Sequence, residues 1–526
     1  MKRRDVLKAT LAGGAALAAP RVLRAESQRV LRFIPQADLA SLDPIWTTAD
    51  VTRNHGFMVF DTLYGIDNAY QPHPQMAAGH TLSADQLQWD ITLRDGLRFH
   101  DNTPVLARDC VASLNRWGKR DAFGSVLMAA TDELSAPSDK TIRFRLKAPF
   151  PLLPAALATI TNMPCVMPER LARTDPFQQV AEVVGSGPFR FLAAERVPGS
   201  RVAYERFAGY VPRQDGPAEY TAGPKPVNFD RVEWTVSPDP ATNAAALSAG
   251  EFDWWENPTI DLVPSLKQSG DLVTVVKDHT GEIGCLRFNE LFPPFDNPAI
   301  RRVVLSAVNQ RDYMEAVAGS DPTLILDKVG LFVPGSPMAS TVGIETMRGG
   351  SDPAKLRQAL QATGYKGERV VVLAASNFPT INAIAQVGGE MLKRIGFNVD
   401  YQSLDWGTVV QRRASRNPVD QGGWNIFFTF LGGIGNVTPA SDIALRADGK
   451  GWFGWPTDPR MEELRLAWFK APEVAAQRKL CAEMQAAFFQ NPSYAPLGMY
   501  FQPTAFRSAL TGVPEGIPQF YRVRRA

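Results

Sequence analysis

The stretch from Val370 to Tyr401 constrains the fold more than any other part of this chain. It begins with a short continuous apolar run, Val370–Leu373, continues with apolar residues at helical spacing up to Gly396, and ends with alternating apolar residues from Phe397. A strand, a helix and a second strand within about thirty residues form a βαβ unit, whose two strands lie parallel in one sheet. The sequence therefore predicts an α/β arrangement in this part of the chain.

Residues 65–180 follow another pattern. Apolar and polar residues alternate over 87–93, and the Asp95-Gly96 turn that follows predicts a hairpin with the residues after it. Thr103-Pro104 opens a helical pattern, and a second alternating run occupies 142–146. We therefore expect a small α+β unit here.

Two Asx-Pro pairs predict where helices begin. Asn297-Pro298 and Asp352-Pro353 each place a capping side chain directly before a proline that suits the first helical turn. By contrast, residues 204–222 and Pro224–Pro226 read as an irregular connection. A domain boundary is expected near this connection.

The first twenty-five residues are typical of an export signal. A basic segment, Lys2–Lys8, precedes the short, weakly apolar run Ala9–Ala19. The paired Arg3-Arg4 resembles the twin-arginine type of signal, with Val6 where that type prefers Phe. The apolar run is too short to span a bilayer, which needs about 20 residues.

Cleavage after Ala18 or after Ala25 fits this signal equally well, and no cysteine lies near either point to carry a lipid anchor. We expect a soluble protein in the periplasm. The alternative is an amphipathic helix that begins the folded body. In an oxidising compartment Cys110, Cys165, Cys285 and Cys481 could pair, but four such scattered residues could equally be buried thiols.

Charge excludes one class of partner. The 526-residue chain has a formal net charge of +2, and residues 1–25 contribute +5 (six basic side chains and one acidic), which leaves −3 for the remainder. A slightly acidic body lacks the clustered Lys and Arg that bind phosphate backbones. We therefore expect no nucleic-acid partner.

Motifs of the common enzyme classes are absent from the sequence. It contains no GxSxG nucleophile elbow, no GxxxxGK[ST] phosphate loop and no HExxH zinc helix. The glycine-rich patch at 432–435 lacks the third glycine of a dinucleotide fingerprint. None of the five histidines is paired at i, i+4, and we expect neither a metal site nor a cofactor. His100, next to Asp101 at a turn, is interpreted as a structural residue.

Trp406 and Trp424 stand out among the eleven tryptophans, because loop-forming residues flank both. One interpretation makes them core residues packed beneath loops, since tryptophan is usually mostly buried. The other makes them aromatic walls of a ligand pocket. The sequence leaves both open.

The segment Trp89–Asp109, WDITLRDGLRFHDNTPVLARD, resembles the signature W-x-I-x-L-R-x-G-x-x-F-H-D-G-x-P-x-x-A-x-D of extracellular solute-binding proteins of family 5. It departs from that signature at Asn102, which replaces a glycine and still tolerates a left-handed turn. The positions that match are Trp89, Ile91, Leu93, Arg94, Gly96, Phe99, His100, Asp101, Pro104, Ala107 and Asp109.

Further marks of this peptide- and nickel-binding class follow in order over about residues 30–510. They are Leu42-Asp43-Pro44, Phe60-Asp61-Thr62-Leu63-Tyr64, Gly185-Ser186-Gly187-Pro188-Phe189, Gly250-Glu251-Phe252-Asp253, Pro294-Phe295-Asp296 with Ile300-Arg301, and Ala362-Thr363-Gly364-Tyr365.

The resemblance implies an α/β, two-lobed periplasmic-binding-protein fold with a hinge, whose first lobe carries an inserted α+β subdomain. The expected division is an export signal at 1–25, lobe I at 26–64, 185–284 and 496–526, the inserted subdomain at 65–184, and lobe II at 285–495.

The resemblance also implies where the solute binds. In relatives the loop after Leu42-Asp43-Pro44 faces the cleft, and here it contains Trp46, Thr48, Asp50 and Thr52, with Asp50 as the candidate acidic contact or else a surface carboxylate. The candidates in lobe II are Trp406, Trp424, Asn425, Phe427 and Asn436.

Both charged anchors of the dipeptide-binding relatives are missing. Ala375 stands where their arginine binds the peptide carboxylate, and Phe427 stands where their aspartate binds the amine. Burying a ligand charge without a partner costs several kcal/mol. We therefore expect a less charged or differently charged organic solute rather than a free dipeptide.

The function implied is that of a periplasmic receptor. It captures a small organic solute, peptide-like or other, and delivers it as a monomer to the permease subunits of an ABC importer. No bond is made or broken, so no enzyme activity is expected. Two alternatives stay open: a cleft-type binding module that acts as a chaperone or signalling partner, and an exported hydrolase.

Overall fold

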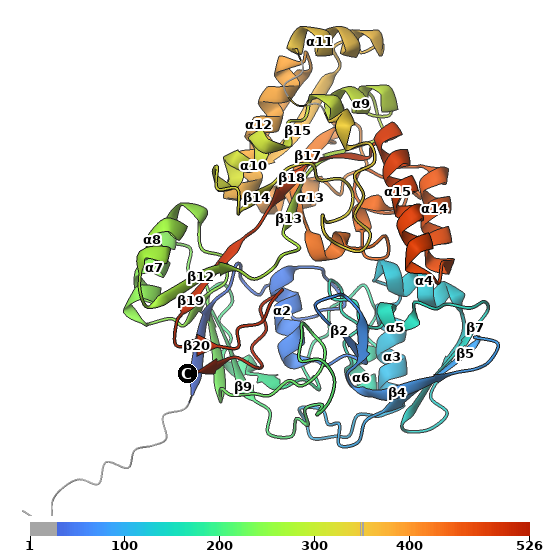
Figure 1. Cartoon of the computed structure of the whole chain (residues 1–526), viewed down its shortest axis with the longest axis vertical. Coiled ribbons are helices and arrows are strands. Elements are labelled where there is room, and N and C mark those ends of the chain that lie inside the picture. Colours follow the sequence, from blue (N-terminus) through green and yellow to red (C-terminus); the bar gives the residue numbers. More distant parts are fainter. Residues whose placement is uncertain (1–28, 348, 350–351) are drawn as a thin grey trace, which may run out of the picture.

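The computed structural model describes residues 29–347, 349 and 352–526. The predicted export signal, with its cleavage points after Ala18 or Ala25, lies outside these residues. Two large β-sheets each form the centre of a lobe, and the lobes are stacked along the long axis of the molecule (Figure 1). No helix within the described ranges has the length and hydropathy of a membrane span.

The sheet of lobe I has seven strands. β1 runs parallel to β10 and β11, and the other pairs are antiparallel. The ring of Phe33 on β1 packs against Trp234, Trp254 and Phe520 with centroid separations of 5.5, 5.1 and 4.9 Å. The strand order is β12 (Leu272–Val276), β19 (Pro503–Arg507), β11 (Trp254–Trp255), β1 (Val30–Ile34), β10 (Arg231–Thr235), β9 (Arg201–Arg206) and β8 (Phe189–Phe191).

The helices of lobe I are α2 (Asp50–Val59), α7 (Pro240–Ala249) and α8 (Val263–Gln268). Two short pairs complete it, β2 (Tyr64–Ile66) with β3 (Pro72–Pro74) and β20 (Leu510–Thr511) with β21 (Arg524–Arg525).

A four-stranded antiparallel sheet with helices forms the predicted α+β unit. Its strands are, in order, β4 (Ala77–Leu82), β5 (Gln88–Leu93), β7 (Thr141–Leu146) and β6 (Thr131–Ser135), and its helices are α3 (Ala107–Trp117), α4 (Ala122–Ala130), α5 (Leu153–Ala156) and α6 (Glu169–Ala172).

The hairpin predicted at Asp95-Gly96 is wrong. The turn exists, with a φ of 79° at Gly96, but the partners of β5 are β4 and β7, and Arg98 instead forms an isolated bridge with Pro104. Alternation shows which face of a strand is buried and not which strand pairs with it. Asn102 takes the left-handed conformation that the signature's glycine position requires, with a φ of 66°.

The sheet of lobe II has six strands and contains the predicted βαβ unit. β15 and β16 are parallel, and α12 (Pro379–Arg394) connects them and packs on the sheet beside α10. The strand order is β14 (Ile325–Leu326), β18 (Tyr494–Tyr500), β13 (Glu282–Phe288), β17 (Ile426–Gly432), β15 (Arg369–Ala375) and β16 (Asn398–Leu404).

Both Asx-Pro predictions for lobe II are confirmed. The side chains of Asn297 and Asp352 accept hydrogen bonds from the amides of Ala299 and Ala354, at 2.9 and 2.8 Å. The helices of this lobe, besides α12, are α9 (Pro298–Ala307), α10 (Gln310–Ala318), α11 (Pro353–Ala362), α13 (Trp406–Arg412), α14 (Pro459–Lys470) and α15 (Val474–Gln490).

Two segments of the described chain join the large sheets. Residues 277–281 lead from β12 to β13, and residues 501–502 lead from β18 back to β19. Because β13 and β18 are antiparallel neighbours, the two connections lie side by side and form the hinge. Both strands run across the predicted boundaries at 284/285 and 495/496, and the domain boundaries themselves stay a prediction.

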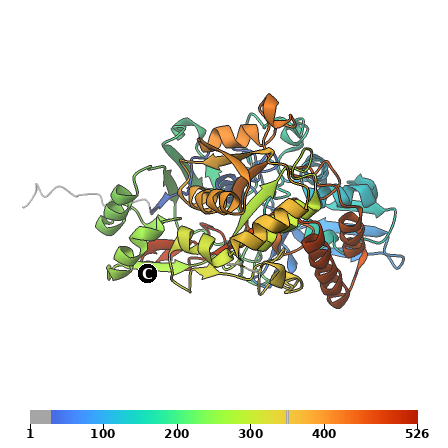
Figure 2. The ribbon, with the colours of Figure 1, turned by 90° about the horizontal axis from the view of Figure 1, so that it is seen from above.

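The lobes also touch away from these connections. Both views place α14 and α15 on the opposite side of the molecule from α7 and α8 (Figure 1 and Figure 2). There Phe469 on α14 packs against Phe123 and Phe150 of the inserted subdomain, with ring centroids 5.5 and 6.4 Å apart. All three side chains are buried. This aromatic contact holds the two lobes together in the observed arrangement.

A buried ion pair connects the Leu42-Asp43-Pro44 mark to α3. The Arg116 Nη2 and Asp43 Oδ2 atoms are 2.6 Å apart, and both side chains are almost fully excluded from solvent. The amides of Ile45 and Val180 also donate to the Asp43 carboxylate, at 3.1 and 3.0 Å. Asp43 therefore joins three segments that are far apart in the sequence.

We expect Asp43→Asn to lower the free energy of unfolding by about 3–5 kcal/mol, because the Arg116 charge would remain buried without a counter-charge. Urea denaturation followed by circular dichroism measures the loss. The matched control is Asp95→Asn, which breaks the exposed pair with Lys140 and should cost less than about 1 kcal/mol. If both variants lost the same free energy of unfolding, the stabilising role of the buried Asp43–Arg116 pair would be contradicted.

Phe469→Ala should favour an open arrangement of the lobes, because it removes buried aromatic area from the contact with the inserted subdomain. Small-angle X-ray scattering should show a larger radius of gyration for the ligand-free variant. Leu466→Ala on the same helix is the control, since Leu466 is 52 % exposed and should leave the scattering unchanged.

Candidate solute-binding site

A cavity of about 700 Å³ lies between the two lobes, beside the hinge. Lobe I contributes α2 and the segments that follow β11 and β12 to its wall. Lobe II contributes the start of β13, the start of α12, α13 and parts of β17 and β18. Because each lobe supplies part of the wall, a solute held here contacts both.

Two of the residues predicted from the sequence line this cavity. Asp50 is the first residue of α2, and Trp406 is the first residue of α13. Asp405 caps α13 by accepting a hydrogen bond from the Thr408 amide at 2.9 Å, which sets the position of the indole at the helix start. The structure thus brings one candidate from each lobe to the same cavity.

The other candidates in lobe I lie outside the cavity lining. The Trp46 indole donates to the Phe177 carbonyl at 3.3 Å, and the buried Thr52 hydroxyl donates to the Ser41 carbonyl at 2.8 Å. Thr48 is exposed just before α2. These contacts shape the loop before the helix, and only Asp50 reaches the cavity.

The remaining candidates in lobe II are fully or almost fully buried. Trp424 packs against Phe427 with ring centroids 5.1 Å apart. Its surroundings are those of a core tryptophan rather than of an aromatic pocket wall. The Asn425 side chain accepts from the Val371 amide at 2.8 Å, and the Asn436 carbonyl accepts from the Val333 amide at 3.1 Å. All four lie outside the cavity lining and support the sheet beneath it.

Sequence reasoning missed the charged residues that line the cavity. Arg53 follows Asp50 by one helical turn, and its Nη1 is 2.8 Å from the Asp50 Oδ1. Glu256, Asp278 and Glu282 line the same wall. The i, i+3 spacing could have indicated Arg53, whereas the three carboxylates come from separate strand ends and no local pattern connects them.

Burial changes the ionisation of two of these carboxyls. It raises the pKa of Glu256 to about 7, although the Gln36 amide and the Asn54 side chain donate to its oxygens at 2.7 and 2.9 Å. Burial, followed by the negative charges of Asp50 and Asp278, also raises the pKa of Glu282 well above its ordinary value. Positive charge in the cavity would favour the ionised forms of both.

The other part of the wall is apolar. Phe378 is 42 % exposed and meets Trp406 edge-on with ring centroids 5.8 Å apart. Ile260 of lobe I and Ile434 of lobe II also line the cavity. The site therefore combines an acidic part with an aromatic and aliphatic part, as expected for a pocket that orients an organic solute.

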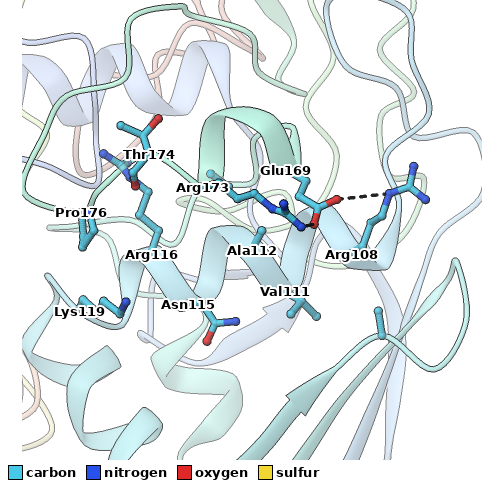
Figure 3. A pocket seen from close by; sticks show the side chains of 12 residues that line it. Arg108, Val111, Ala112, Asn115, Arg116, Lys119, Glu169, Arg173, Thr174 and Pro176 are labelled. Carbon is cyan, nitrogen blue, oxygen red and sulfur yellow. Dashed lines mark hydrogen bonds and ion pairs between the residues drawn. The ribbon is translucent and has the colours of Figure 1, made fainter.

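A second pocket, of about 380 Å³, lies between α3 and α6 on the inserted subdomain (Figure 3). Glu169 pairs there with Arg108 and Arg173, at 3.7 and 2.7 Å. Arg116 is held by Asp43. Only the inserted subdomain lines this pocket, so a solute there would not contact both lobes as it does in the interlobe cavity.

Comparison with known proteins agrees with this architecture. The family model described as bacterial extracellular solute-binding proteins, family 5 Middle, matches residues 71–452. The chain belongs to this family. As a member, it is a solute-binding receptor for ABC import, and the resemblance deduced from the sequence is confirmed.

One curated relative matches over the whole chain. It is a probable peptide ABC transporter periplasmic-binding protein of Sinorhizobium fredii, 35% identical over 534 residues that cover 100% of both chains.

Two solved structures share the two-lobed fold. A dipeptide-binding protein from Pseudoalteromonas sp. SM9913, in complex with Met-Leu, is 19% identical with a TM-score of 0.78 and covers 95% of this chain and 100% of its own. A binding protein of Agrobacterium tumefaciens R10 in complex with agropinic acid is 19% identical with a TM-score of 0.77. The match covers 95% of this chain and 98% of that protein. The predicted fold class is confirmed by these likenesses.

Glu256 should make stability depend on pH. Its pKa of about 7 in the folded protein exceeds the ordinary 4.5, so its contribution to the free energy of unfolding is complete below about pH 4.5 and is lost as the pH rises through 7. Between those pH values, Glu256→Gln should reduce the pH dependence of the free energy of unfolding by up to about 1.4 kcal/mol per pH unit. Denaturation at several pH values measures it. Glu463→Gln, at a side chain 68% exposed, should leave the slope unchanged.

Proposed function

We propose that this protein is the periplasmic receptor of an ABC importer and holds a small organic solute in the interlobe cavity. The observation that carries the proposal is that both lobes line one cavity beside the hinge. A solute that contacts both lobes binds the closed arrangement more tightly than the open one and so shifts the population toward closure. The permease subunits would recognise the closed receptor.

The solute class we propose is peptide-like or opine-like, by analogy with what the relatives are named for. The relative from Sinorhizobium fredii is named as a peptide-binding protein, and the two solved structures hold Met-Leu and agropinic acid. In this chain Ala375 and Phe427 are buried and apolar where dipeptide-binding relatives carry charged anchors. We therefore place a conjugated amino-acid derivative before a free dipeptide.

Export by the twin-arginine route, action as a monomer and the absence of catalysis belong to the same proposal. A receptor retains its solute unchanged, an exported hydrolase consumes it, and a chaperone-like module retains a protein segment instead. Mass spectrometry of molecules released from freshly purified protein distinguishes these three outcomes by the mass of what is bound.

The mature protein should be stabilised by at least one class of small solute. At a solute concentration of 100 times Kd, the free energy of unfolding should rise by about 2.7 kcal/mol and Tm should rise with it. Differential scanning fluorimetry with pooled peptides, sugars and opine-like compounds measures the shift. Trp406→Ala should reduce the shift for the solutes found. If no class shifts Tm of the folded wild-type protein, the proposal is wrong.

A further inference from the structure

Carboxylates from both lobes line the cavity on opposite sides of the hinge. Asp50 begins α2 in lobe I, and Glu282 begins β13 in lobe II. They are close enough for the charge of Asp50 to raise the pKa of Glu282. Among the described residues, Glu282 has no ion-pair or hydrogen-bond partner for its side chain, so no direct contact offsets its charge when it ionises.

The whole cavity wall has an excess of negative charge. Five acidic residues line it against two basic ones, Arg53 and Lys277. Lys277 is already engaged, with its Nζ 2.7 Å from the Glu515 Oε1. The acidic residues are Asp50, Glu256, Asp261, Asp278 and Glu282. When these carboxyls are ionised, bringing their like charges together in a partly dry cavity opposes closure of the empty receptor.

Arg53 is a second and independent feature of the same wall. Its side chain is only 7% exposed, and its Nε donates to no atom of the described residues. The ion pair from Nη1 to Asp50 is the one contact in those residues that offsets its charge directly. A buried guanidinium with donors to spare fits an oxygen acceptor supplied by the solute.

We propose that the solute carries a cationic nitrogen that lies between Glu282 and Asp50, and an oxygen acceptor that meets the guanidinium of Arg53. This assignment rests on the proposed function and names its substrate class: an amino-acid derivative with a free amine or guanidine. The apolar part of that molecule packs against Phe378 and Trp406. The cation attracts both Asp50 of lobe I and Glu282 of lobe II, whose ionised carboxylates otherwise repel each other. Binding of the cation therefore favours closure of the lobes.

The proposal predicts that protons leave when the solute binds. The groups around Glu282 are Asp50 and Asp278, which raise its pKa, Arg53, which lowers it, and the Tyr500 ring on the neighbouring strand β18. In the empty cavity the proton on Glu282 is therefore retained to a higher pH than usual. A cation that favours the ionised carboxylate displaces that proton, so affinity should increase as the pH rises above the ordinary glutamate pKa.

The first test sorts solutes by charge. Peptides and amino-acid conjugates are supplied in pairs, one with the amine free and one with it acetylated, and binding is measured by isothermal titration calorimetry. We expect the free amine of each binding pair to bind at least about tenfold more tightly, since the acetylated partner leaves the buried carboxylates without a cation. Equal binding of the acetylated partner would overturn the assignment.

The second test uses a matched pair of variants. Glu282→Gln should weaken binding of the cationic solute at least about tenfold. Glu463→Gln removes the same charge at a side chain that is 68% exposed and lies outside the cavity lining, and it should change Kd less than about twofold. Glu282→Gln keeps the size of the protonated carboxyl and adds no charge, so Tm of the ligand-free variant should equal or exceed that of the wild type, which shows that it folds.

Calorimetry in two buffers of different ionisation enthalpy adds a measurement that a merely structural role would not change. The wild type should release protons as it binds at a pH above the ordinary glutamate pKa, and Glu282→Gln should release fewer. If Glu282→Gln leaves solute binding unchanged, the proposed contact of the cation with Glu282 and Asp50 is wrong, and the proposed receptor function is unaffected. A wild-type protein that binds no solute overturns both.

Discussion

The arrangement of this molecule depends on the paired connections between its two sheets. Residues 277–281 and 501–502 join the lobes side by side, because β13 and β18 are antiparallel neighbours that enter lobe II together. Within the described residues, covalent continuity joins the lobes only along this edge. Elsewhere they meet through side chains, such as the contact between Phe469 and Phe123. A cavity beside such a hinge can open and close without disturbing either core.

The motifs that identify the family serve the scaffold rather than the cavity. Asp43 is paired with Arg116, and Asp61 accepts from Lys225 at 2.7 Å, with both side chains fully buried. His100 contacts the Gly187 carbonyl at 3.0 Å and so joins two of the marks. These residues hold lobe I rigid, which explains why the signature identifies the class of protein without naming its solute.

The residues of the cavity wall are less completely paired than those of the scaffold. Its acidic residues are incompletely neutralised by the protein, and burial raises the pKa of Glu256 to about 7. Buried charge without a full complement of partners lowers stability. Such a wall is consistent with a receptor in which the ligand supplies the charged partners that the protein lacks. The aromatic edge formed by Phe378 and Trp406 supplies contact area beside these charges.

The sequence by itself determined the local structure and the family. Periodicity predicted the βαβ unit, Asn297 and Asp352 predicted helix starts, and Asn102 the left-handed turn, because these depend on neighbours a few residues apart. Only the tertiary structure decided which strand pairs with β5 and which side chains meet in the cavity. Glu282 and Arg53 are more than 200 residues apart, and no local pattern connects positions that only the packing of two lobes brings together.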